Sequence, residues 1–150
     1  MADAVYDAGG NWLESHLSRL GGKYVGAVLV EIEAGRQSAL EDAVAAIDAE
    51  GLRVAVLPAG DAVALAGETL AVELVGQDRP GIVREVSRVL AALGVNIDDF
   101  TTATEHGSWS GEPLFRAAAT LALPAGLSSQ AVREALEAIS GEIMVDFTIS

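Results

Sequence analysis

The 150-residue chain contains no cysteine, and only 9 of its residues are lysine or arginine, against 22 aspartates and glutamates. Without thiols it can form no disulfide bond, thiolate metal site or cysteine nucleophile. Its formal net charge of −13 repels nucleic-acid phosphates, so we expect no direct binding to DNA or RNA. No apolar run reaches the roughly 18–20 residues that a membrane-spanning helix needs, so we expect no membrane association. The first residues show no basic cluster typical of a secretory signal, and we expect a cytoplasmic protein.

Hydrophobic residues are plentiful. They make up 51% of the chain, and the mean hydropathy is +0.36. A disordered chain would be far less apolar. The length suits one ordinary domain or two small ones, with enough apolar material for a core in either case.

Two parts of the chain repeat in the same order. The segment GVNID at residues 94–98 aligns with GGNWL at residues 9–13, and AVREALEAI at 131–139 aligns with ALEDAVAAI at 39–47. The extra residues of the second copy fall in a hairpin, where loops tolerate insertion. The sequence therefore predicts two copies of one module.

The second copy predicts six elements. Leu70, Val72 and Leu74 alternate with other residues in a half-buried strand at 69–76. A helix is expected to begin at Pro80, where the missing N–H costs nothing, and to end at Gly94. The remaining elements are strands at 95–105 and 114–123, a helix capped by Ser128 or Ser129 that extends to residue 139, and a strand at 142–149. The order βαββαβ predicts an α+β, ferredoxin-like module, with a four-stranded antiparallel sheet and two helices on one face.

The first copy lacks the opening strand and most of the first helix. Its expected elements are a helix stub, strands at 10–20 and 24–33, a helix at 37–50 and a strand at 52–57. We therefore expect a truncated module at residues 1–59, a linker at 60–68 and a complete module at 69–150. Trp12 is expected in a core or an interface, because the loop that would face it is absent.

The missing strand leaves the strand at 52–57 without a neighbour on one side. Three explanations are open. The natural chain could begin further upstream, another segment such as residues 62–66 or a strand of another subunit could fill the position, or the first module could be partly unfolded. We favour the upstream start as an expectation.

The pattern of Asp78-Arg79-Pro80-Gly81 followed one helix later by Gly94-Val95-Asn96-Ile97 resembles the ACT domain, a small regulatory module. The tandem arrangement and GGNWLESHLSRLGGKYVG at residues 9–26 resemble the glycine cleavage system transcriptional repressor family. This resemblance implies tandem βαββαβ modules in a regulatory protein that is not an enzyme and needs no cofactor.

The resemblance also implies a ligand site at an interface between modules. Its residues are those of the loop after the first strand and of the start of the second strand: Gln77, Asp78, Arg79, Pro80, Gly81, Ile82, Asn96 and Ile97. The chemistry suits an amino acid, because helix N–H groups can receive a carboxylate, Asp78 can accept from an ammonium group, and the Asn96 amide can both donate and accept. Serine-sensing relatives carry an amide at the position of Asp78 and a histidine at that of Gly76, so serine recognition by their scheme is not expected.

A purely structural interpretation of the same residues remains open. Asp78 could cap the following helix, Pro80 and Gly81 could serve only the turn, and Asn96 could bond the loop backbone. Asp98 and Asp99 are adjacent on a strand and face opposite sides, so we expect no metal site with Glu105 and His106. We find no catalytic set of residues.

Two functions follow as hypotheses. The first is an amino-acid-responsive regulator, with glycine or another small amino acid as ligand. By resemblance it acts through a protein partner such as a DNA-binding regulator, whose basic surface the acidic chain could meet. The alternative is a structural or protein-interaction module without a ligand. We expect a homo-oligomer in either case.

Overall fold

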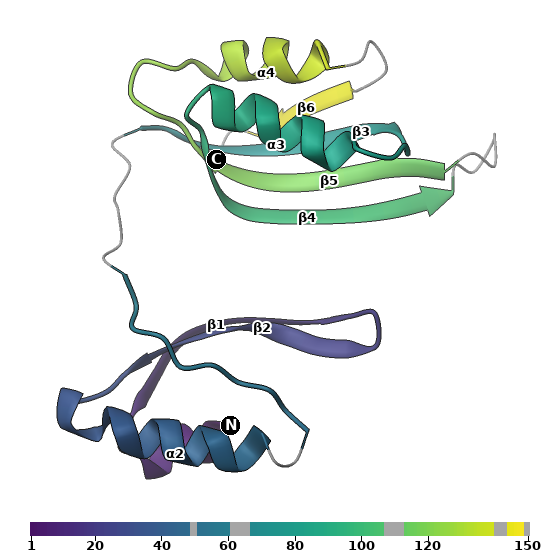
Figure 1. Ribbon diagram of the computed structural model, residues 1–150. Coiled ribbons are helices and arrows are strands. Elements are labelled where there is room, and N and C mark those ends of the chain that lie inside the picture. The colour runs from purple at the N-terminus through teal and green to yellow at the C-terminus, as the bar shows by residue number, and fades with distance from the viewer. Residues whose placement is uncertain (49–50, 61–66, 107–112, 140–143, 149–150) are drawn as a thin grey trace. The chain divides into compact units, whose positions relative to one another are not determined.

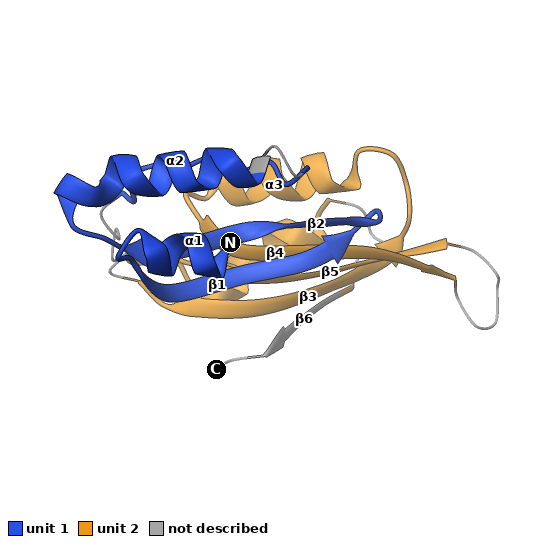
Figure 2. Cartoon of the chain, turned by 90° about the horizontal axis from the view of Figure 1, so that it is seen from below, with its two compact units in different colours: residues 1–62 blue, residues 63–150 orange. Residues whose placement is uncertain are grey.

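The computed structural model describes residues 1–48, 51–60, 67–106, 113–139 and 144–148 (Figure 1). The chain divides into two compact units, residues 1–62 and 63–150, which Figure 2 distinguishes by colour. Most of the expected linker and the turn between the last hairpin strands, at 107–112, lie outside the described residues. No helix in the described part of the chain is long and apolar enough to cross a lipid bilayer.

Unit 2 is a four-stranded antiparallel sheet with two helices on one face (Figure 1). The strand order is β4-β5-β3-β6, so the opening strand β3 lies between β5 and β6. This confirms the predicted ferredoxin-like fold. The elements are β3 (Thr69–Gln77), α3 (Ile82–Ala92), β4 (Asn96–His106), β5 (Pro113–Ala122), α4 (Ser129–Glu137) and β6 (Met144–Thr148).

The core of unit 2 lies between the sheet and the helices. The alternation predicted for β3 is confirmed, because Leu70, Val72 and Leu74 are at most 2% exposed. Residues at helical spacing on α3 and α4 meet them, and each buried aliphatic side chain contributes about 1.5–3 kcal/mol. The buried members are Leu70, Val72, Leu74, Ile82, Val86, Leu90, Val95, Phe115, Ala117, Ala119, Leu121, Leu123, Val132 and Leu136.

The helix starts follow local backbone chemistry. The prediction that α3 begins at Pro80 was wrong: α3 begins at Ile82, and Gly81 before it has φ +91°, in the left-handed region that glycine adopts without strain. The α4 cap was predicted correctly, since the Ser128 hydroxyl accepts a 3.2 Å hydrogen bond from the Ala131 N–H. This helix ends at Glu137, two residues before the predicted end.

The described residues of unit 1 form a two-stranded antiparallel hairpin and two α-helices. Its small core consists of Val5, Ala8, Leu40 and Val44. Trp12 packs against this cluster, in agreement with its expected place in a core. The elements are α1 (Ala2–Asp7), β1 (Asn11–Leu20), β2 (Lys23–Glu31), a 3₁₀ turn η1 (Ala34–Arg36) and α2 (Gln37–Asp48).

The strand predicted at residues 52–57 does not form, although its burial pattern is that of a strand. Leu52, Val54 and Val56 are half-buried, whereas the residues between them are exposed. No backbone hydrogen bond joins this segment to other described residues. The reason lies in the topology. The corresponding strand of unit 2, β6, pairs with β3, and the described residues of unit 1 contain no strand equivalent to β3.

Candidate ligand-binding site

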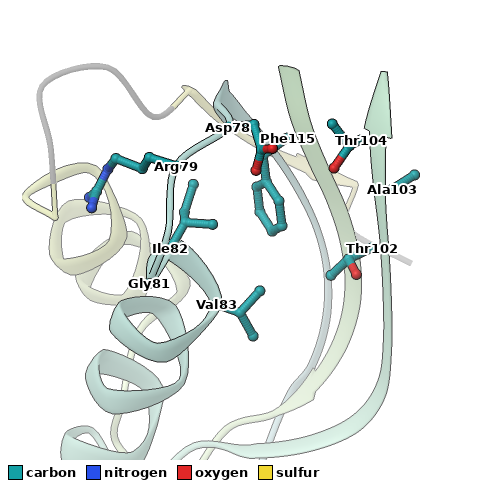
Figure 3. A pocket seen from close by; sticks show the side chains of 9 residues that line it. All are labelled: Asp78, Arg79, Gly81, Ile82, Val83, Thr102, Ala103, Thr104 and Phe115. Carbon is teal, nitrogen blue, oxygen red and sulfur yellow. The ribbon is translucent and has the colours of Figure 1, made fainter. Parts of the chain in front are cut away.

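A cavity of about 330 Å³ opens in unit 2 where α3 begins (Figure 3). Its volume lies near the lower end of the range for small-molecule sites. The loop between β3 and α3, the first turn of α3, and the strands β4 and β5 contribute to it. The lining residues are Asp78, Arg79, Gly81, Ile82, Val83, Thr102, Ala103, Thr104 and Phe115.

The loop is fixed at both ends. The Asp78 N–H donates a 3.0 Å hydrogen bond to the Pro113 carbonyl at the start of β5, and the Ile82 N–H donates to the Arg79 carbonyl at 3.3 Å. The buried Ile82 side chain, 4% exposed, anchors the first turn of α3 in the core. Gly81 supplies the left-handed backbone conformation between these points.

The two charged side chains of the loop take different directions. In Figure 3 the Asp78 carboxylate lies beside Phe115, on the cavity side, whereas Arg79 extends away from the cavity. The Arg79 guanidinium donates to both carboxylate oxygens of Glu85, at 3.1 Å to Oε1 and 2.5 Å to Oε2. Asp78 does not cap α3, whose N-cap is Gly81 without a side-chain bond, so that structural interpretation was wrong. Asp78 therefore places negative charge at the cavity, while Arg79 is bound to Glu85.

The ion pair predicts a pH dependence. Hydrogen bonding from Arg79 is the largest influence and holds the pKa of Glu85 below its usual range. Desolvation opposes it, and the positive charges of Arg79 and Arg84 add to the lowering. A lowered pKa in the folded state gives stability that is present above the unfolded pKa and is lost as the pH falls through the folded pKa. We expect Glu85→Gln to lose less stability than the wild type between pH 7 and pH 3, measured by urea unfolding. Glu137→Gln, at the exposed end of α4, is the control and should lose as much as the wild type.

The residues of β4 and β5 that line the cavity were not predicted from the sequence. Thr104 lies opposite Phe115 and Thr102 opposite Ala117, so both threonines share the helix-facing side of the sheet with buried core residues. Thr102 and Thr104 lie beyond the side chains that α3 covers, and they remain exposed. The alternation along β4 could indicate which of its side chains face the helices. Only the pairing register of β4 with β5 places these hydroxyls beside the loop.

The predicted site residues fall into two groups at opposite ends of the sheet. Gln77 at the end of β3 pairs with Leu114, whereas Asn96 at the start of β4 pairs with Ala122. These two partners on β5 are eight residues apart, so Gln77 and Asn96 lie roughly 27 Å from each other along the strand direction, at the rise of an antiparallel strand. Asp78, Arg79, Gly81 and Ile82 line the cavity, Pro80 lies in the exposed turn, and Asn96 and Ile97 are far from it.

Asn96 and Ile97 have other surroundings within the unit. The exposed Asn96 amide donates a 2.7 Å hydrogen bond to Asp98, not to the loop backbone. Ile97 is half-buried and packs against the core. A single unit therefore cannot bring the two groups together around one small molecule.

The cavity can offer a small molecule three kinds of contact. Asp78 can accept hydrogen bonds from a cation, Thr102 and Thr104 can donate and accept, and Ile82, Val83 and Phe115 give apolar surface. The first-turn N–H groups of α3 add positive partial charge at the mouth. In the described part of the chain, no group of three or more histidine, aspartate or glutamate side chains could hold a metal ion.

Comparisons with known proteins agree with this architecture. The sequence model of the ACT domain matches residues 71–141, which include the loop and both groups of predicted residues. An "unknown protein" from Galdieria sulphuraria is 29% identical with a TM-score of 0.78, covering 99% of this chain and 87% of that chain. A "putative glycine cleavage system transcriptional repressor" is 14% identical with a TM-score of 0.68 and the same coverage. No curated protein matches the chain.

A formyltetrahydrofolate deformylase from Pseudomonas putida KT2440 is similar to part of this chain. It is 16% identical with a TM-score of 0.45, covering 55% of this chain and 29% of that chain. The two structures that match over the full length show that the whole chain has a known fold, with both units included. The family match identifies an ACT domain at residues 71–141, within unit 2.

Proposed function

We propose that this protein is a non-enzymatic, cytoplasmic regulator that binds an amino acid at unit 2 and acts through a protein partner. The cavity at the start of α3 carries this proposal. It combines one carboxylate, two hydroxyls, helix N–H groups and apolar walls within a volume suited to a small molecule. A zwitterion of the size of glycine or a slightly larger amino acid fits these groups, with its ammonium at Asp78 and its carboxylate at the helix N–H groups.

The separation of the two residue groups supports a site shared between modules. Among the described strands, β4 is an edge strand, because only β5 pairs with it. If the β4 strands of two copies pair antiparallel across a two-fold axis, the start of one strand lies beside the end of the other. Asn96 of the second copy then lies near Thr104 and the cavity mouth. Asn96 and Ile97 contribute to the proposed site in this way, and the protein is a homo-oligomer.

The acidic surface supports action through a basic protein partner. The formal net charge of −13 disfavours contact with nucleic acid and favours a basic protein surface. The fold is shared with the repressor structure, so regulation of the glycine cleavage system through a DNA-binding regulator is the context we propose. The alternative is a protein-interaction module without a ligand.

Thermal unfolding with a panel of free amino acids, glycine and serine included, tests the proposal. At a hundredfold excess over its dissociation constant, a ligand adds about 2.7 kcal/mol of stability. For a chain of this size the shift in Tm is roughly 5–10 °C. We expect a selective shift with one or a few amino acids, and light scattering should show an oligomer that the same ligand stabilises.

Variants separate binding from general stability. Asp78→Ala and Asn96→Ala should each remove the shift, whereas Asn11→Ala, at the matching position of the first copy, should keep it. A chain that folds but shows no shift with any amino acid would support the interaction module instead. A shift that survives both Asp78→Ala and Asn96→Ala would place the ligand elsewhere.

A further inference from the structure

Val83 lines the cavity with an apolar side chain that lies outside the described core. It is 40% exposed, whereas Ile82 and Phe115, which also line the cavity, are 4% exposed and belong to the core. The buried stripe of α3 follows the helical spacing of Ile82, Val86 and Leu90. Val83 lies beside this stripe, so its side chain is open to a molecule in the cavity.

The cavity has a polar end and a more apolar end (Figure 3). Asp78 and Thr104 lie at the end near the loop, whereas Val83 and Thr102 lie at the other end, one on α3 and the other on β4. Thr102 and Thr104 are two residues apart on β4, which is roughly 7 Å at the rise of an antiparallel strand. A group bound at Asp78 is therefore about the length of a short side chain from Val83.

The charges near Val83 leave this end of the cavity apolar. Arg84 and Glu85, which follow it on α3, are not among the described lining residues. Arg79 does line the cavity, but its guanidinium extends away from it and binds Glu85. The Val83 side chain thus faces the cavity without a charged group beside it in the described lining.

An amino acid bound as proposed directs its side chain to this apolar end. Its ammonium and carboxylate groups are attached to one carbon atom, and Asp78 and the first-turn N–H groups of α3 hold both at the loop end. The side chain on that carbon then extends toward Val83. Glycine has no side chain and leaves Val83 uncovered, whereas an aliphatic side chain removes apolar surface from water.

We propose that the cavity selects amino acids with a short aliphatic side chain, and that Val83 is the residue that contacts this side chain. The inference rests on the proposed function, because it concerns the same cavity. Asp78 and the helix N–H groups bind the charged groups that all amino acids share, and Val83 distinguishes between amino acids. Ile82 and Phe115 are held in the core, so Val83 is the apolar lining residue that can change without disturbing the core.

Isothermal titration calorimetry of the full chain with glycine and L-valine tests this assignment. An added methylene in an enclosed apolar pocket strengthens binding about tenfold or more, and in this half-open cavity we expect about tenfold for the whole valine side chain. Val83→Ala shortens the contacting side chain and should reduce this preference for L-valine to about threefold or less. The affinity for glycine should stay the same, because glycine does not reach Val83.

Two further variants separate side-chain contact from other effects. Val83→Thr keeps nearly the same volume but replaces a methyl group with a hydroxyl, so it should also reduce the preference for L-valine. Val89→Ala makes the same change as Val83→Ala at a half-buried position of α3 that packs against the core. It should lower stability and keep the preference, and circular dichroism should show that each variant is folded.

The other outcomes overturn the inference. If Val83→Ala left the preference unchanged, or weakened glycine and L-valine equally, Val83 would not contact the ligand side chain, while the proposed function would stand. The same holds if the wild type bound glycine more tightly than L-valine, or bound only amino acids with charged or aromatic side chains. If no amino acid of the panel bound the wild type, the proposed function would fail together with this inference.

Discussion

Leu121→Ala should lower the free energy of unfolding of unit 2 by about 3 kcal/mol. Leu121 lies on β5 at the centre of the sheet and is 0% exposed, among Leu70, Leu90 and Leu136 at 0–1%. Removing the side chain forfeits its transfer free energy and leaves a cavity that the paired strands on both sides cannot close. Urea unfolding followed by circular dichroism, with hydrogen exchange to assign the unit, measures the loss.

The effect should be confined to unit 2. The buried residues of the two units form separate clusters, so the slowly exchanging amides of α2 and β1 should keep their stability. Leu57→Ala is the matched control, because Leu57 is 79% exposed and its loss should change stability by less than about 0.5 kcal/mol. A loss of equal size from both substitutions would contradict the described core.

Gly26→Ala should destabilise the hairpin of unit 1 by about 2 kcal/mol or more. Gly26 on β2 lies opposite Leu17, and an added Cβ would collide with the main-chain carbonyl oxygen of His16. Backbone atoms of a paired strand cannot turn aside as a flexible side chain can, so the strands must separate or shift register. Hydrogen exchange of the β1 and β2 amides, compared between variant and wild type, measures the loss.

Gly35→Ala is the control for this substitution. An added Cβ at Gly35 would have no atom within 4 Å, and its backbone is not in the left-handed region. That change should be neutral or slightly stabilising, because alanine loses less entropy on folding. If hydrogen exchange became faster throughout β1 and β2 in Gly35→Ala but stayed unchanged in Gly26→Ala, the strands would have to pair differently.

The sequence predicted the fold where local patterns and topology agree. The alternation in β3 and the helical spacing in α3 each point to one buried face, and a βαββαβ order leaves few ways to pack those faces. The prediction for residues 52–57 failed because a strand needs a partner. Alternating Leu52, Val54 and Val56 fix which side faces the core, but no local pattern supplies hydrogen bonds from a neighbour. The predicted start of α3 was wrong for a local reason, because Gly81 adopts a left-handed turn conformation and not a helical one.

Only the loop of the candidate site could be predicted from the sequence. The loop from Asp78 to Ile82 is contiguous, so its own turn chemistry marks it in the sequence. Thr102, Thr104 and Phe115 reach the same cavity only through the register of β4 on β5, which sequence spacing does not determine. That same register places Asn96 at the far end of the sheet, a distance that the resemblance to ligand-binding modules alone could not reveal.

The distance between Asn96 and the loop has a quantitative consequence for a regulator. A site that needs residues from two copies exists only in the associated form, so ligand affinity and subunit affinity are linked and each strengthens the other. The apparent ligand affinity then falls when the protein is diluted below its dissociation constant for association. Under the proposed function, such a protein would report the product of two concentrations, those of the amino acid and of the protein itself, and its abundance in the cell would set the threshold at which it responds.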